Sequence, residues 1–93
     1  MKVFACKRQG SYNGGLILVA APTKEEAFNV FAHDKRFDWM IDCRTPEGYW
    51  TDIDDENAII TSYYYPLEKW FEIEFLNAQV SEPQIIEENG HSE

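Results

Sequence analysis

The chain has 93 residues and a formal net charge of −9, with 17 acidic side chains against 8 Lys and Arg. A chain of this length makes one domain with a modest core. Its negative charge argues against direct binding of nucleic-acid phosphates. No apolar run approaches the roughly 18 residues that a membrane span needs, so we expect one domain over residues 1–93 that stays out of the membrane.

The first predicted element is a β-hairpin. Val3–Cys6 and Leu16–Ala21 are apolar runs of strand type, and the second contains no polar residue, which is typical of a strand central in its sheet. Between them, Gly10–Gly15 is rich in Gly and Asn, which tolerate the positive φ of a tight turn. The two runs are therefore predicted to pair antiparallel.

A capped helix is predicted to follow the hairpin. Thr23 is the expected N-cap, and Glu26, three residues later, completes a capping-box pattern. Phe28 and Phe31 recur at helical spacing and form part of one apolar stripe. We expect this helix over about residues 24–34, with the stripe lying on the hairpin.

The chain after the helix predicts short strands separated by turns. Residues 36–43 suit a strand by alternation and one helical turn by spacing, so both interpretations stay open. Later segments are clearer. Strands are predicted at 49–51 (very short), at 58–65, at 70–76 (half-buried, with an acidic face) and at 84–87 (a brief edge strand). A turn is predicted at 45–48, an acidic loop at 52–57 and a flexible tail at 88–93. The predicted fold class is therefore α+β, with a small antiparallel sheet of about four or five strands packed against one main helix.

The cysteines and histidines predict no catalysis. Cys6 and Cys43 are too few for a disulfide framework and lack metal-ligand spacing. A nucleophile also needs a base within hydrogen-bond reach. Either cysteine with His33 is the one conceivable pair, and nothing in the spacing recommends it. We expect no catalytic residue and no enzyme activity.

The acidic loop predicts no metal site. Asp52, Asp54 and Glu56 begin like a calcium-binding loop, but Asn57 stands where the turn glycine belongs, and Tyr63 replaces the bidentate glutamate. An ordinary solvated loop is the better interpretation. We expect neither a metal nor a cofactor.

Charge and aromatic residues instead predict a binding surface. Residues 1–36 carry six basic and three acidic side chains, whereas residues 37–93 carry fourteen acidic and two basic ones, and such asymmetry favours a partner chosen by charge. Three consecutive tyrosines in a strand cannot all face one core, although they could also simply cover the sheet. The candidate partner-binding residues are Tyr63, Tyr64, Tyr65, Trp50, Trp70, Asp52, Asp54, Asp55 and Glu56.

The segment Gly10–Phe28 (GSYNGGLILVAAPTKEEAF) resembles the opening of small accessory proteins carried by phages and mobile elements. It is similar to the start of one type II-C anti-CRISPR protein, which has a strand, a turn, an apolar strand ending in two alanines and a helix carrying Glu-Ala. The resemblance covers about a fifth of the chain and transfers no binding residue. It implies a non-enzymatic inhibitor that docks on a bacterial nuclease.

The leading hypothesis is thus a non-catalytic protein-binding module in the cytoplasm of a bacterial host. Its partner is expected to be a bacterial protein with a basic surface, such as a nuclease, and the chain itself to be a monomer or weak homodimer. Two alternatives are a ligand-binding protein or minor enzyme with a pocket between helix and sheet, and a self-associating protein that pairs through an edge strand near Ile73 or Ile85.

Overall fold

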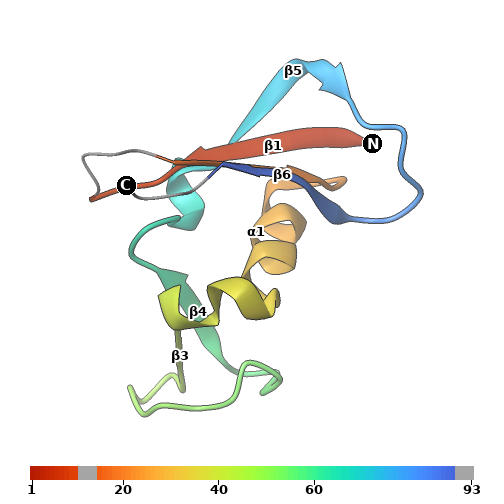
Figure 1. Cartoon of the computed structure of the whole chain (residues 1–93). Helices are drawn as coiled ribbons and strands as arrows, with labels where there is room; N and C mark the ends of the chain where they lie inside the picture. The colour runs from red at the N-terminus through yellow and green to blue at the C-terminus, as the bar shows by residue number, and fades with distance from the viewer. Residues whose placement is uncertain (11–14, 90–93) are drawn as a thin grey trace.

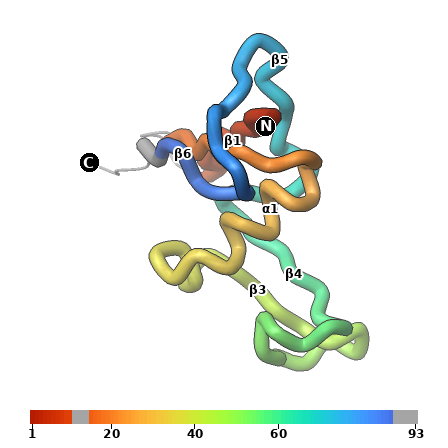
Figure 2. Tube along the Cα trace, turned by 90° about the vertical axis from the view of Figure 1, so that its right-hand side faces the viewer, coloured from red at the N-terminus to blue at the C-terminus, as the bar shows by residue number. Residues whose placement is uncertain are grey.

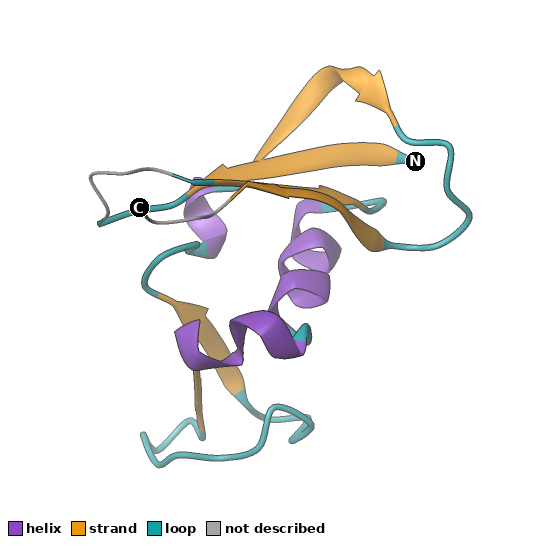
Figure 3. Ribbon diagram, in the orientation of Figure 1, coloured by secondary structure: helices purple, strands orange, loops and turns teal. Residues whose placement is uncertain are grey.

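The computed structural model describes residues 1–10 and 15–89. Four antiparallel strands form one sheet in the order β5–β1–β2–β6, and two further strands form a second, smaller sheet (Figures 1 and 3). The elements are β1 (Lys2–Lys7), β2 (Leu16–Ala20), α1 (Lys24–Ala32), the 3₁₀ helix η1 (Lys35–Met40), β3 (Ile41–Arg44), β4 (Ile59–Ser62), the 3₁₀ helix η2 (Leu67–Lys69), β5 (Phe71–Asn77) and β6 (Gln84–Asn89). The α+β prediction, with its hairpin and one main helix, is confirmed.

The hairpin β1–β2 forms the middle of the four-stranded sheet. Phe4 lies opposite Val19 and Cys6 opposite Ile17, which turns all four side chains toward α1. The backbone N–H of Arg8 donates to the carbonyl oxygen of Gly15 at 2.9 Å and closes the strand pair. The predicted turn residues 11–14 lie outside the described part of the chain.

Helix α1 begins at the predicted cap. The backbone N–H of Glu26 donates to Oγ1 of Thr23 at 3.1 Å, and Thr23 itself has extended backbone angles, as an N-cap residue should. The helix ends at Ala32, and the N–H of His33 bonds the carbonyl oxygen of Asn29 at 3.1 Å. Helix α1 packs against β2 and β6.

Residues 36–43 contain both of the structures that the sequence allowed. The first part belongs to η1, whose start is capped by Asp34: its Oδ1 accepts the N–H of Arg36 at 2.9 Å. The second part belongs to β3, which pairs with β4. The switch comes at Ile41, where the backbone is already extended.

Five aromatic side chains form the centre of the core. Phe31 has no exposed surface, and its ring centroid lies 5.3 Å from Phe37, 5.2 Å from Tyr65 and 5.8 Å from Trp70. Phe28 closes the cluster from the same helix, 5.9 Å from Phe31. Edge-to-face and tilted ring pairs of this kind add to the free energy gained by burial alone.

Strand β5 departs from its predicted burial. Phe71 is 48% exposed and Phe75 97% exposed, so the expectation of a half-buried strand was wrong. Two facts explain this. Helix α1 packs on β2 and β6 rather than on β5. The pairing of β5 with β1 is also irregular, because an advance of two residues along β1 (Lys2 to Phe4) corresponds to five residues along β5 (Asn77 to Glu72). The apolar residues of β5 therefore bulge toward solvent, where the strand diverges from β1 (Figure 1).

The opposite edge of the sheet matches its prediction more closely. Strand β6 pairs with β2 and packs Ile85 toward the core. It extends through Asn89, so it includes the first two residues of the expected tail 88–93, while residues 90–93 lie outside the described part. Within the described residues, no helix has both the length and the apolar composition needed to cross a membrane.

Gly10→Ala is expected to lower the free energy of unfolding by about 1–2 kcal/mol, because Gly10 has φ +72° and an alanine Cβ opposes that left-handed conformation. That Cβ would also lie 2.7 Å from Cε2 of Tyr63, but the Tyr63 side chain is 72% exposed and can swing aside. Urea denaturation provides the measurement. Gly10→Asn is the matched control: Asn is bulkier but tolerates positive φ, so it should cost less, and a larger loss would show that crowding dominates.

Candidate functional site

The second sheet and its connecting loop form an arm that stands away from the main sheet. We call residues 41–62 the β3–β4 arm; in Figures 1 and 2 α1 lies between it and the four-stranded sheet. The arm holds six acidic side chains and Arg44 as its one basic residue, a net charge of −5 out of −9 for the chain. Its acidic residues are Asp42, Glu47, Asp52, Asp54, Asp55 and Glu56.

The arm has an inner apolar side and an outer aromatic side. Ile41, Ile53 and Ile60 pack against the core, which holds the arm to α1 and η1. By contrast, Tyr49 is 73% exposed and Trp50 66% exposed. Sequence reasoning predicted Trp50 but missed Tyr49, although its position directly after the Pro-Glu-Gly turn could have indicated it.

Trp50 is held in place although it is exposed. The Arg44 guanidinium carbon lies 4.1 Å from the centroid of the Trp50 ring. Its Nη1 also donates to the carbonyl oxygen of Gly48 at 3.0 Å, and the turn is closed by the N–H of Tyr49 donating to Oγ1 of Thr45 at 3.1 Å. An exposed indole with a defined orientation loses less conformational entropy on binding.

The acidic loop is braced by two of its own carboxylates. Asp55 accepts hydrogen bonds from the Asn57 N–H and from Oγ1 of Thr51, both at 2.9 Å. These two bonds, the backbone one first, hold the pKa of Asp55 below its usual range. Asp52 accepts the N–H of Asp54 at 3.3 Å.

The other two predicted acidic residues of the loop are more available to a partner. Among the described residues, none provides a hydrogen bond or ion pair to the carboxylates of Asp54 and Glu56. The described part of the chain also contains no group of three His, Cys, Asp or Glu side chains that could hold a metal ion. The loop therefore presents negative charge toward solvent on a preformed backbone.

Two of the predicted surface aromatics belong to the core instead. Tyr65 is 1% exposed and Trp70 3% exposed, which corrects their assignment as partner-binding residues. The indole Nε1 of Trp70 donates to the carbonyl oxygen of Tyr65 at 3.0 Å. Because the indole N–H is hydrogen-bonded, burial of this large ring leaves no polar group unpaired and carries little free-energy cost.

The remaining tyrosines form a separate aromatic cluster. Tyr63 is exposed, and its ring lies 5.1 Å from that of Tyr64, which in turn lies 5.8 Å from Trp39. The guanidinium carbon of Arg8 sits 4.7 Å from the Tyr64 ring centroid. The structure thus groups Trp50 with the four acidic candidates on one arm and assigns the three tyrosines and Trp70 to other places.

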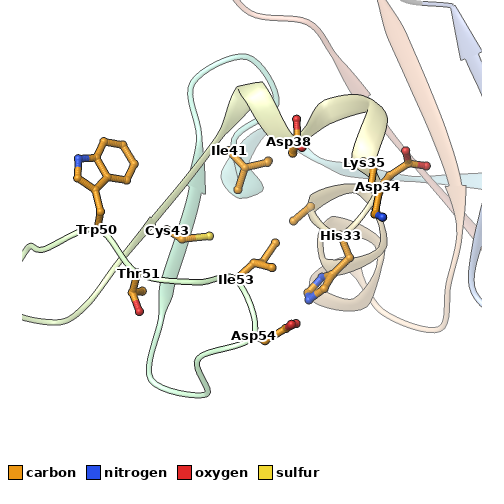
Figure 4. Close-up of a pocket in the computed structure, with 11 residues that line it drawn as sticks. His33, Asp34, Lys35, Asp38, Ile41, Cys43, Trp50, Thr51, Ile53 and Asp54 are labelled. Carbon is orange, nitrogen blue, oxygen red and sulfur yellow. The ribbon is translucent and has the colours of Figure 1, made fainter.

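A pocket of about 450 Å³ lies between the arm and the end of α1 (Figure 4). His33 and Cys43 both line it, on opposite sides with Ile53 between them (Figure 4), so this pair, one of the two thiol–imidazole pairs that the sequence allowed, shares a pocket without a contact between the two side chains. Burial, with the nearby Asp52 and Asp42 carboxylates, raises the pKa of the Cys43 thiol. A nucleophilic cysteine needs the opposite shift, so the direction of this pKa shift does not favour Cys43 as a nucleophile.

Both cysteines are expected to react slowly with iodoacetamide in the folded protein at pH 8, at least about 10-fold more slowly than in urea, because the thiolate is the reactive species. Burial, assisted by Glu68, raises the pKa of Cys6 to about 12. Mass spectrometry of tryptic peptides would give the rate at each site. Rapid labelling of Cys43 in the folded chain would contradict the assignment and favour a catalytic thiol.

Comparisons of this chain with protein-family models, curated proteins and solved structures found no match. Its function is therefore argued from the chemistry of its own surface.

Proposed function

We propose that the protein is a non-catalytic binding module that docks its β3–β4 arm on a basic surface of another protein. The observation that carries this proposal is the exposure of Tyr49 and Trp50 on an arm with a net charge of −5. Trp and Tyr are enriched among the residues that contribute most of the binding free energy in protein interfaces.

The two features have different roles. The carboxylates of the arm attract and orient a basic partner, which raises the association rate more than the final affinity. The indole of Trp50 supplies apolar contact area once the surfaces meet, and it is already positioned by Arg44. Binding of this kind needs no bond-making machinery.

The partner class follows from the sign of the charge. Basic grooves occur in proteins that bind nucleic-acid phosphates, and an acidic arm can compete for such a groove. We therefore propose a bacterial nucleic-acid-handling protein, for example a nuclease, as the partner. An inhibitor carried by a phage or mobile element, as the resemblance of Gly10–Phe28 implies, is one setting in which this module would act, and it stays a prediction.

Affinity capture from a bacterial lysate tests the proposal. The immobilised wild-type chain should retain basic proteins at low salt and lose them at about 0.5 M salt, where exposed charges are screened within a few Å. A variant with Asp52→Asn, Asp54→Asn and Glu56→Gln should retain less, and added DNA or RNA should displace the captured protein. Equal capture by this variant, or capture unaffected by nucleic acid, would contradict the proposal.

One observation favours self-association as a second candidate function. Phe71, Phe75 and Leu76 are exposed on β5, an edge strand whose outer backbone is unpaired within the described residues. Exposed apolar edges of this kind can pair with a second copy of the chain. Light scattering at increasing concentration, comparing wild type with Phe75→Glu, would detect this, and a concentration-independent monomer would reject it.

A further inference from the structure

The pocket beside the arm combines an apolar floor with acidic groups at its rim. Ile41, Cys43 and Ile53 contribute the floor, while the residues Asp34, Asp38 and Asp54 line it together with one basic residue, Lys35. The volume of about 450 Å³ falls within the range of about 300–1,000 Å³ that is common for binding pockets. The charge of the lining therefore favours a cation.

Two of the three carboxylates are available. Asp34 is already engaged by Arg36, whose Nε and Nη2 donate to its two oxygens at 3.1 and 3.0 Å. Asp38 and Asp54 have no hydrogen-bond or ion-pair partner for their carboxylates among the described residues. The Cys43 side chain, 8% exposed, also points into the pocket without a hydrogen-bond partner there (Figure 4).

His33 can add a hydrogen-bond acceptor. Its Nδ1 lies 2.9 Å from the carbonyl oxygen of Asn29, and a carbonyl can only accept, so Nδ1 carries the proton. In the neutral imidazole this leaves Nε2 as an acceptor. The His33 ring lies at the pocket on the side of Asp54 (Figure 4).

We infer that this pocket receives an arginine side chain from the basic partner; the inference rests on the proposed function and names the group that the arm recognises. An arginine has an apolar stem to cover Ile41 and Ile53, and a planar guanidinium with five donors for Asp54 and the neighbouring Nε2 of His33, while Asp38 adds negative charge at the opposite end of the pocket (Figure 4).

The chain itself already uses both modes of guanidinium recognition beside this pocket. Arg36 binds Asp34 through two parallel N–H donors, and Arg44 stacks on Trp50 at 4.1 Å. A lysine ammonium could match the negative charge but not the planar arrangement of five donors. The pocket is therefore expected to prefer arginine to lysine.

An NMR titration with a small probe tests the inference without needing the partner. Nα-acetyl-arginine methylamide, added to the ¹⁵N-labelled chain, should shift the amide signals of Ile41, Cys43 and Ile53 with a dissociation constant of about 1–10 mM. Nα-acetyl-citrulline methylamide, its neutral isostere, should shift them at least about 10-fold more weakly, and the lysine analogue should be intermediate. Equal effects of arginine and citrulline, or shifts spread over the whole acidic surface, would overturn the inference.

A pair of matched variants separates the pocket from the arm as a whole. Asp38→Asn with Asp54→Asn should weaken arginine binding at least about 10-fold, because the charge-assisted hydrogen bond to Asp54 and the negative charge of Asp38 are both lost. Glu47→Gln with Glu56→Gln removes the same charge from arm residues outside the pocket lining and should change arginine binding less than about 2-fold. Equal weakening by the two pairs would overturn the inference.

The same variants distinguish failure of the inference from failure of the proposed function. If the Asp38 and Asp54 pair captures the partner from lysate as wild type does, while the triple loop variant does not, the pocket inference fails and the proposed function stands. If the triple variant also captures normally, the proposed function fails. Probe binding restricted to the pocket would then show a guanidinium site without a role in docking.

Discussion

Phe31→Ala is expected to lower the free energy of unfolding by about 3–5 kcal/mol, the usual cost of emptying a phenylalanine site in a core. Phe31 has no exposed surface and contacts the rings of Phe28, Phe37, Tyr65 and Trp70. A domain of this size has roughly 5–15 kcal/mol in total, so the variant should be largely unfolded at temperatures that wild type withstands. Urea denaturation followed by near-ultraviolet circular dichroism would measure the loss.

Phe75→Ala is the matched control, because it removes the same atoms from a side chain that is 97% exposed. A substitution at such a position normally changes stability by less than about 0.5 kcal/mol. Similar losses for Phe31→Ala and Phe75→Ala would contradict the assignment of Phe31 to the centre of the core. They would also mean that a side chain of β5 contributes as much to core packing as one of α1 does.

Trp50→Ala is expected to weaken binding of the captured partner by about 30-fold, which corresponds to about 2 kcal/mol and is the usual threshold for a residue that dominates an interface. The side chain is 66% exposed, so its loss should leave the stability of the fold nearly unchanged. Isothermal titration calorimetry with the purified partner would give the affinity. A circular dichroism melt of the variant would confirm that it is folded.

Trp39→Ala provides the comparison for this prediction. Trp39 is 63% exposed, but it lies on η1 in contact with Tyr64 rather than on the arm. This variant should bind the partner with wild-type affinity, within about 3-fold. If Trp39→Ala weakened binding and Trp50→Ala did not, the partner would dock on the tyrosine cluster and the arm would be the wrong surface.

The N-terminal third could be predicted because its signals are local. Thr23 caps α1 through a bond that spans three residues, and the hairpin depends on neighbouring apolar runs. Residues 36–43 were ambiguous for a physical reason: the first five residues belong to a 3₁₀ helix and the last three to a strand, so two periodicities follow each other within eight residues. Such short elements are decided by tertiary packing more than by their own pattern.

The candidate site was only partly visible in the sequence. The acidic loop and Trp50 could be identified from composition, but the burial of Tyr65 and Trp70 depends on contacts with α1, which no local pattern reveals. The pocket was equally hidden, because His33 and Cys43 lie ten residues apart and line it together only because η1 carries the chain from α1 into β3. Exposure of β5 follows from where α1 packs, and its alternating sequence predicted the opposite.

The most direct test of docking through the charged arm is the salt dependence of partner affinity. It compares wild type with the triple variant Asp52→Asn, Asp54→Asn, Glu56→Gln. The account predicts that wild type binds at least about 10-fold more tightly than the variant at about 0.1 M salt, and that the difference nearly disappears at about 0.5 M. Equal affinities at both salt concentrations would contradict it, because recognition would then not depend on the charge of the arm.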